Sequence, residues 1–108
     1  MRTVCTQEEL DGIAGPVLLK FTAEWCLPCK EMQPALEQLE REYAHACQFV
    51  LVDVDAAEAL VAAHQVRQIP FVKISDEGEN RMAAVSPAEA EIREQLNILS
   101  ETGQKMLE

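Results

Sequence analysis

The chain has few aromatic residues and few glycines for its length. Among its 108 residues there are one Trp, one Tyr and three Phe, and only four Gly. These glycines do not form a Gly-x-Gly-x-x-Gly pattern, so the sequence lacks the fingerprint of a dinucleotide-binding loop. With so few aromatic side chains available, the core has to be built mainly from aliphatic residues.

Long apolar runs and basic residues are also scarce. No stretch approaches the 18 or more apolar residues of a membrane-spanning helix, and residues 1–9 lack the apolar run of a secretory signal. Lys and Arg number 9 against 19 Asp and Glu, which gives a net charge of −10. Nucleic acid and anionic membranes would repel such a chain. We therefore expect a cytoplasmic protein that binds neither nucleic acid nor membrane.

Length and composition predict a single domain spanning residues 1–108. Hydrophobic residues make up 48% of the chain and charged residues 26%, which is typical of a globular domain. The sequence contains no repeat, low-complexity tract or linker. We expect residues 100–108 to be a C-terminal tail, either frayed or forming a short extra turn, and the protein to be a monomer.

Short apolar segments alternate with segments of helical spacing, which predicts an α/β domain. The order is β-α-β-α-β-α-β-β-α, so the first strands should be parallel with right-handed connections and the last hairpin should add an antiparallel edge. Helices are expected on both faces of this mixed sheet. Strands are expected at 2–5, 16–22, 48–55, 70–75 and 81–85, and helices from Thr6 to about Ile13, Cys29 to Ala46, Ala56 to Ala63 and after a capping box at 86–89.

Two cysteines, separated by two residues, stand where the strand at 16–22 gives way to a long helix. Thiols with this spacing on the first turn of a helix are close enough to form a disulfide. Cys26 lies beside free backbone amides and the positive end of the helix dipole, which stabilise a thiolate. The thiolate is the nucleophile of disulfide exchange, and Cys29 would attack the resulting mixed disulfide.

The residues around these cysteines resemble the thioredoxin family. Residues 21–30 match the pattern Phe-x-Ala-x-Trp-Cys-x-Pro-Cys-Lys, and Pro34, Val-Asp-Val-Asp at 52–55 and Ile-Pro at 69–70 follow in the family's order over about residues 2–99. The resemblance implies a thioredoxin fold and an enzyme that reduces protein disulfides. It makes Cys26 the exposed attacking thiol and Cys29 the resolving thiol.

The resemblance also implies how this reaction is supplied. An external thiol reductase would provide the electrons, and client proteins with disulfides would receive them. No tightly bound cofactor is expected, because the Cys26–Cys29 pair itself carries the electrons.

Residues beside the cysteines are assigned to substrate binding by the same resemblance. Trp25 flanks the site, and Leu27 and Pro28 lie between the two cysteines. Pro70 is implied to be a cis-proline that faces the cysteines, with Ile69 offering backbone groups to an extended substrate strand.

Three positions depart from the family pattern. Leu27 replaces a Gly and adds apolar surface, and residues 84–87 replace a Gly-containing loop beside the site. Lys20 stands where most members bury an Asp behind the resolving thiol. We expect its ammonium group to stabilise a thiolate, with a surface-seeking lysine as the alternative. Leu27 and the altered loop also motivate a second interpretation, a redox-dependent partner-binding module without general reductase turnover.

Metal binding is the competing interpretation of the cysteine pair. A structural zinc site needs four ligands, and the remaining candidates, Cys5, Cys47, His45 and His64, do not provide a second close pair. We therefore expect no metal. Cys5 and Cys47 should lie near 13 Å apart along the sheet, beyond the reach of a disulfide, at about 3.3 Å per residue.

The remaining titratable residues have ordinary structural interpretations. We expect His45 and His64 to be solvated on helices. Asp53 and Asp55 end a strand and are expected to cap the helix that follows.

Overall fold

The protein is described from a computed structural model that defines residues 1–107, with side chains to residue 101. Strands and helices alternate in the predicted order. They are β1 (Arg2–Thr3), α1 (Gln7–Asp11), β2 (Pro16–Thr22), α2 (Leu27–Tyr43), β3 (Gln48–Asp53), α3 (Glu58–Ala63), β4 (Phe71–Asp76), β5 (Glu79–Val85) and α4 (Glu89–Leu107).

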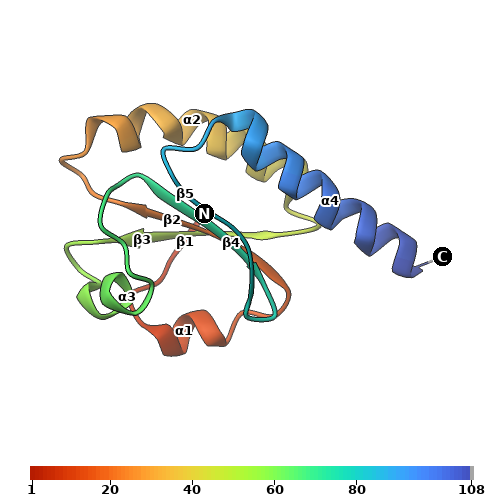
Figure 1. Ribbon diagram of the computed structural model, residues 1–108, viewed down its shortest axis with the longest axis horizontal. Coiled ribbons are helices and arrows are strands. Elements are labelled where there is room, and N and C mark those ends of the chain that lie inside the picture. The colour runs from red at the N-terminus through yellow and green to blue at the C-terminus, as the bar shows by residue number, and fades with distance from the viewer. Residues whose placement is uncertain (108) are drawn as a thin grey trace.

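The sheet is mixed, as the sequence predicts. Its strand order is β1-β3-β2-β4-β5; β3 runs parallel to β1 and β2, whereas β4 is antiparallel to both β2 and β5. Helices α2 and α4 cover one face and α1 and α3 the other (Figure 1). Because β2 and β3 are parallel, their carboxyl ends meet at one edge, where the chain turns into α2 and toward α3. The predicted fold class is confirmed.

Alternation along the central strand β2 divides the core into two aliphatic clusters. Leu18 is buried with the apolar side chains of α2 and α4. Leu19 and Phe21 are buried on the other face, with residues of α1 and α3. Lys20 is two residues from Leu18, so it shares the α2–α4 face. A charged side chain is thereby directed into the interior of the fold.

The two predicted capping boxes have different outcomes. At α1 the expected N-cap is present: the Thr6 hydroxyl accepts a hydrogen bond from Glu9 N–H at 3.1 Å, whereas Glu9 Oε1 accepts from the N–H of Cys5, one residue before the N-cap, at 3.1 Å. The box predicted at Ser86–Glu89 is wrong, because α4 begins at Glu89 and not at Pro87. Here Ala88 precedes the helix, and its N–H donates to Glu91 Oε1 at 3.2 Å.

Several boundaries differ by a few residues from those expected. The third strand ends at Asp53, two residues early, and α3 begins at Glu58 instead of Ala56. Helix α4 continues to Leu107, past residue 100 where a tail was expected. Residue 108 of that expected tail lies outside the described residues. No helix within residues 1–107 is both long and apolar enough to cross a membrane.

The predicted hairpin joins β4 and β5. Glu77 and Gly78 have φ values of 51° and 83°, the left-handed conformation that a two-residue hairpin turn requires at both central positions. The pairing shifts in register between Ile74 and Ser75, which marks a β-bulge. Strand β5 is the outermost strand on this side of the sheet.

Candidate active site

The two cysteines of the predicted site are joined by a disulfide at the start of α2. Their Cα atoms are 5.3 Å apart. Cys26 is the N-cap residue, and its Sγ accepts a hydrogen bond from Cys29 N–H at 3.2 Å. Pro28 occupies the first helical turn, where its missing N–H costs no hydrogen bond. The sulfur of Cys26 therefore lies at the positive end of the helix dipole, as the sequence predicts.

Cys26 is less exposed than the family resemblance implies. Only 4% of its surface is accessible, and Cys29 is completely buried. The Cys26 side chain turns inward to cap the helix, and the pair packs with Ala23 and with half-buried Val54 and Ile69. The expectation of an exposed Cys26 is corrected in this disulfide-bonded state.

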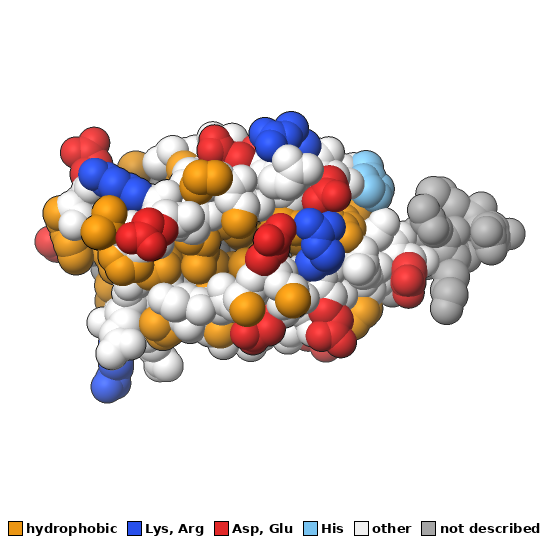
Figure 2. All heavy atoms as spheres, turned by 90° about the horizontal axis from the view of Figure 1, so that it is seen from above, with side chains coloured by type: hydrophobic (Ala, Val, Ile, Leu, Met, Phe, Trp, Pro, Cys, Tyr) orange, Lys and Arg blue, Asp and Glu red, His pale blue; other side chains and the backbone are white. Residues whose placement is uncertain are grey.

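An exposed apolar rim surrounds the disulfide instead. Trp25 and Leu27 are 69% and 64% exposed, and Pro28 is also exposed. Figure 2 shows hydrophobic side chains gathered at this end of the molecule, away from the end of α4. The apolar surface expected from Leu27 is therefore present beside the cysteines.

Asp53 and Asp55 do not cap α3 as expected. Ala57 is the N-cap residue of that helix and has no side-chain cap. Asp55 Oδ2 instead accepts a hydrogen bond from Trp25 Nε1–H at 2.8 Å, and Asp53 Oδ1 accepts one from Asp55 N–H at 2.9 Å. The end of β3 thus fixes the indole beside the disulfide. Sequence reasoning missed this contact because the partners are 30 residues apart.

The peptide bond between Ile69 and Pro70 is cis, as the resemblance implies. Ile69 packs against the cysteine cluster, which brings this segment to the site. The Pro70 carbonyl accepts a hydrogen bond from Ser86 N–H at 2.8 Å. Ser86 has a φ of 46°, the left-handed region that favours glycine, at the position where a Gly-containing loop is usual. The substrate-binding roles of these residues stay predictions.

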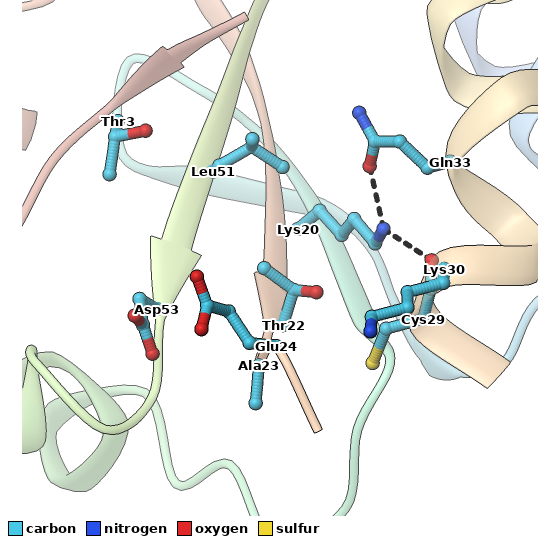
Figure 3. Close-up of a pocket in the computed structure, with 10 residues that line it drawn as sticks. All are labelled: Thr3, Lys20, Thr22, Ala23, Glu24, Cys29, Lys30, Gln33, Leu51 and Asp53. Carbon is cyan, nitrogen blue, oxygen red and sulfur yellow. Dashed lines mark hydrogen bonds between the residues drawn. The ribbon is translucent and has the colours of Figure 1, made fainter. Parts of the chain in front are cut away.

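Lys20 lies behind the disulfide and is only 1% exposed. Its Nζ donates hydrogen bonds to the Cys29 carbonyl and to Gln33 Oε1, both at 2.7 Å (Figure 3). The alternative of a lysine whose head reaches the surface is therefore wrong. Burial lowers the pKa of Lys20, partly opposed by the carboxylate of Glu37. Gln33 was not predicted, although its place four residues after Cys29 puts it on the same helix face.

A cavity of about 340 Å³ adjoins this lysine. Figure 3 shows the lining residues, which come from β1, β2, β3, the β2–α2 connection and the first turns of α2. Lys20, Cys29 and Gln33 all border it. Cys29 is thus inaccessible at the protein surface and borders this cavity beside Lys20.

The other two cysteines are free thiols, as expected. Cys5 is exposed and Cys47 is buried. Burial raises the pKa of the Cys47 thiol to about 12. Among the described residues, no three His, Cys, Asp or Glu gather into a group that could hold a metal ion.

The two histidines differ from each other. His45 is exposed, with Nε2 3.0 Å from Ser100 Oγ. His64 is half-buried, which corrects the expectation of a solvated residue: Nε2 lies 3.0 Å from Gln7 Oε1 and Nδ1 lies 3.1 Å from Lys73 Nζ. Burial lowers the pKa of His64, and the positive charge of Lys73 lowers it further.

Comparison with known proteins gives one consistent family. The thioredoxin family model matches residues 5–98. A thioredoxin-like protein of Synechocystis is 34% identical over 84% of this chain and 88% of its own, and thioredoxin C-2 of Corynebacterium nephridii is 42% identical over 59% of each chain. The chain thus spans less than two thirds of the length of the Corynebacterium relative.

Solved structures agree with the sequence matches. The thioredoxin of Fasciola hepatica superposes with a TM-score of 0.83 at 26% identity, covering 92% of this chain and 99% of its own. A mutant thioredoxin from Halobacterium salinarum gives 0.81 at 29% identity, covering 90% of this chain and 88% of its own. The chain belongs to the thioredoxin family, and its cysteine pair is that of a thiol–disulfide oxidoreductase.

Proposed function

We propose that the protein reduces disulfide bonds of client proteins, with Cys26 as the attacking thiol and Cys29 as the resolving thiol. The observation that carries the proposal is the disulfide at the first turn of α2, with Cys26 Sγ in the N-cap position. A thiolate formed there is stabilised by the backbone amides and the helix dipole. Family membership supports the same chemistry.

The reaction consists of two exchanges between sulfur atoms. In the first, the Cys26 thiolate attacks a client disulfide, so that a Cys26–client bond forms and one client sulfur leaves as a thiolate. In the second, the Cys29 thiolate attacks Cys26 Sγ, the Cys26–Cys29 bond forms and the second client sulfur leaves. Two electrons pass to the client, whose thiolates take up protons from water. The protein ends as the disulfide.

An apolar rim is the proposed contact for clients. Trp25, Leu27 and Pro28 are exposed beside the disulfide and half-buried Ile69 packs against it, so a partly unfolded client can cover the cysteines with apolar contacts. An external thiol reductase then restores the dithiol. We place this cycle in a reducing compartment such as the cytoplasm, which suits the free thiols of Cys5 and Cys47. We propose the protein as a monomer in this cycle, since one chain carries both reacting cysteines.

Insulin reduction in the presence of dithiothreitol tests this proposal. Insulin precipitation should accelerate with the natural protein, and Cys26→Ser or Cys29→Ser should abolish the acceleration. Cys5→Ser and Cys47→Ser are matched controls that also remove a thiol and should keep the activity. Cys29→Ser should in addition accumulate a mixed disulfide with insulin, detectable by mass spectrometry. A Cys26→Ser protein of full activity would overturn the proposal.

A redox-dependent binding module is the second candidate. Leu27, exposed between the two cysteines, favours it because an apolar residue at this point suits one dedicated partner. A module of this kind would fail to reduce insulin yet would retain one partner tightly in a single redox state. The insulin assay therefore separates the two functions.

A further inference from the structure

Lys20 is a buried charged group that the exchange steps above do not use. Its two hydrogen-bond partners, the Cys29 carbonyl and the Gln33 side-chain amide, are both uncharged. Within residues 1–101, none of the ion pairs involves Lys20. Burial of an ammonium without a paired counter-ion is costly, and in the oxidised protein the exposed carboxylate of Glu37 offsets only part of this cost.

We propose that Lys20 is a positioning residue that serves as the counter-cation of the Cys29 thiolate in the reduced protein. This inference rests on the proposed function, because it concerns the resolving cysteine of the same pair. Reduction of the disulfide creates a sulfur anion on the residue whose carbonyl the ammonium contacts. Reduction therefore supplies the negative charge, the Cys29 thiolate, that can pair with the Lys20 ammonium group.

The geometry fixes the ammonium beside Cys29. Lys20 extends from β2 toward α2, and Gln33 holds the Nζ atom one helical turn beyond Cys29 (Figure 3). The direct contact is to the backbone of Cys29, so Lys20 acts on the sulfur through its electric field. Figure 3 shows the Cys29 sulfur on the side of the residue away from Nζ, so the effect is one of a nearby opposite charge, which lowers the pKa of an acidic group, and not of a direct contact.

Other charged groups near Lys20 are less well placed to neutralise it. Glu37 on α2 is exposed and raises the pKa of Lys20 less than burial lowers it. Three further charged residues line the same cavity without a hydrogen bond to Nζ: Glu24, Lys30 and Asp53. Cys29 is completely buried and Lys20 nearly so, which weakens the screening of their interaction by solvent, although both residues border the cavity.

Two consequences follow for the exchange reaction. The resolving step requires a Cys29 thiolate, which attacks Cys26 Sγ and releases the client sulfur, and the field of Lys20 increases the fraction of Cys29 in this form. Stabilising the thiolate also stabilises the reduced protein relative to the disulfide. The ammonium group thus speeds resolution and makes the pair a weaker reductant than it would be without the charge.

Lys20→Met tests the inference, because Met retains much of the apolar stem and removes the charge. We expect the pKa of the Cys29 thiol to rise by about one to two units. The signal to measure is the Cβ chemical shift of Cys29 in the reduced protein across the pH range, since it reports each cysteine separately. In redox buffers at a pH above the pKa of the Cys29 thiol in both proteins, the disulfide should be about 10- to 100-fold more favoured in the variant, which is about 30–60 mV, and the difference should disappear at a pH below both pKa values.

Lys73→Met is the matched control. Lys73 is half-buried on β4, contacts His64 through Nζ and lies among residues of the opposite face. The substitution makes the same change in net charge, and both the Cys29 titration and the redox equilibrium should stay as in the natural protein. Equal shifts in the two variants would overturn the inference, because the effect would then come from net charge alone.

Gln33→Glu is a second variant that keeps the lysine. It places a carboxylate on the ammonium group, so it should also raise the pKa of the Cys29 thiol. An unchanged titration in a folded Lys20→Met protein overturns the inference, and so does an unchanged Gln33→Glu titration if Lys20→Met does not fold. The Cys29 titrations need no client protein. Their failure can therefore be distinguished from failure of the proposed function, in which the natural protein would not reduce insulin.

Discussion

Lys20 and Lys73 lie on neighbouring strands in the middle of one sheet, but their ammonium groups reach opposite faces and different partners. Lys20 is enclosed between β2 and α2 and bonds to a carbonyl and an amide. Lys73 is half-buried near α1 and α3 and contacts the imidazole of His64. The same residue type is thus part of the redox site on one face and part of a polar rim on the other.

The comparison shows how the alternation of side chains along a strand places the residues beside the disulfide on one face of the sheet and purely structural residues on the other. On β2, Leu18 and Lys20 face α2, which carries the disulfide, whereas Leu19 and Phe21 face α1 and α3. Among residues 1–101, the buried charged side chain is Lys20 on the first face, where it contacts Cys29. On the second face, β2 packs against the apolar cluster formed with α1 and α3, which stabilises the strand.

Leu18→Ala and Leu19→Ala test whether both faces support the fold. Both side chains are essentially inaccessible, so each substitution removes buried methyl groups and leaves a cavity. We expect each to reduce the free energy of unfolding by about 2–5 kcal/mol, measured by urea denaturation of the oxidised protein. A loss from only one variant would mean that one face alone supports the fold.

His64 makes the stability of the α1–α3 face depend on pH. Its pKa is lowered in the folded protein by burial and by Lys73, so the unfolded chain binds the proton more readily. Stability should therefore rise with pH between the lowered pKa and the unfolded value of about 6.5, with no further contribution above it. His64→Gln should flatten this rise in urea midpoints measured from about pH 5 to 8.

His45→Gln is the control for that experiment. It removes the exposed histidine at the end of α2 and should leave the slope as in the natural protein. A slope that persists in His64→Gln would assign the pH dependence to other groups.

Ser86→Gly, in the connection between β5 and α4, should have the smallest effect. The left-handed conformation of Ser86 costs any residue with a side chain about 1–2 kcal/mol, and glycine would remove this cost. Glycine also loses more backbone entropy on folding, which reduces the stabilisation by about 0.5–1 kcal/mol. We expect a net stabilisation of up to about 1 kcal/mol, read from the thermal midpoint. Ser75→Gly, in the extended strand β4, should instead destabilise the protein.

Local patterns were sufficient to predict most of the fold and the central pair of the site. The apolar run of β2 and the Thr6–Glu9 box are encoded within a few residues, so the sequence predicts them directly. The spacing of Cys26 and Cys29 at a helix start predicts their disulfide for the same reason. The start of α4 was misplaced because Ser86 and Pro87 suit a capping box, whereas their conformation is set by the contact of Ser86 with Pro70.

Contacts between distant segments could not be predicted. The bond from Trp25 to Asp55 and the contacts of His64 with Gln7 and Lys73 depend on how the strands align. The burial of Lys20 was within reach, because alternation places it on the same face as Leu18. Its hydrogen bond to Gln33 needs the position of α2 over the sheet, which local spacing does not give.

Strand β5 has a consequence for the behaviour of the protein at high concentration. As an outermost strand it offers backbone groups that a second sheet could pair with. Its residues Glu79 and Arg81 are charged and exposed, and the bulge between Ile74 and Ser75 interrupts the regular pairing beside it. A neighbouring molecule that added a strand here would have to desolvate those charges, so this border discourages intermolecular sheet growth and fibril formation.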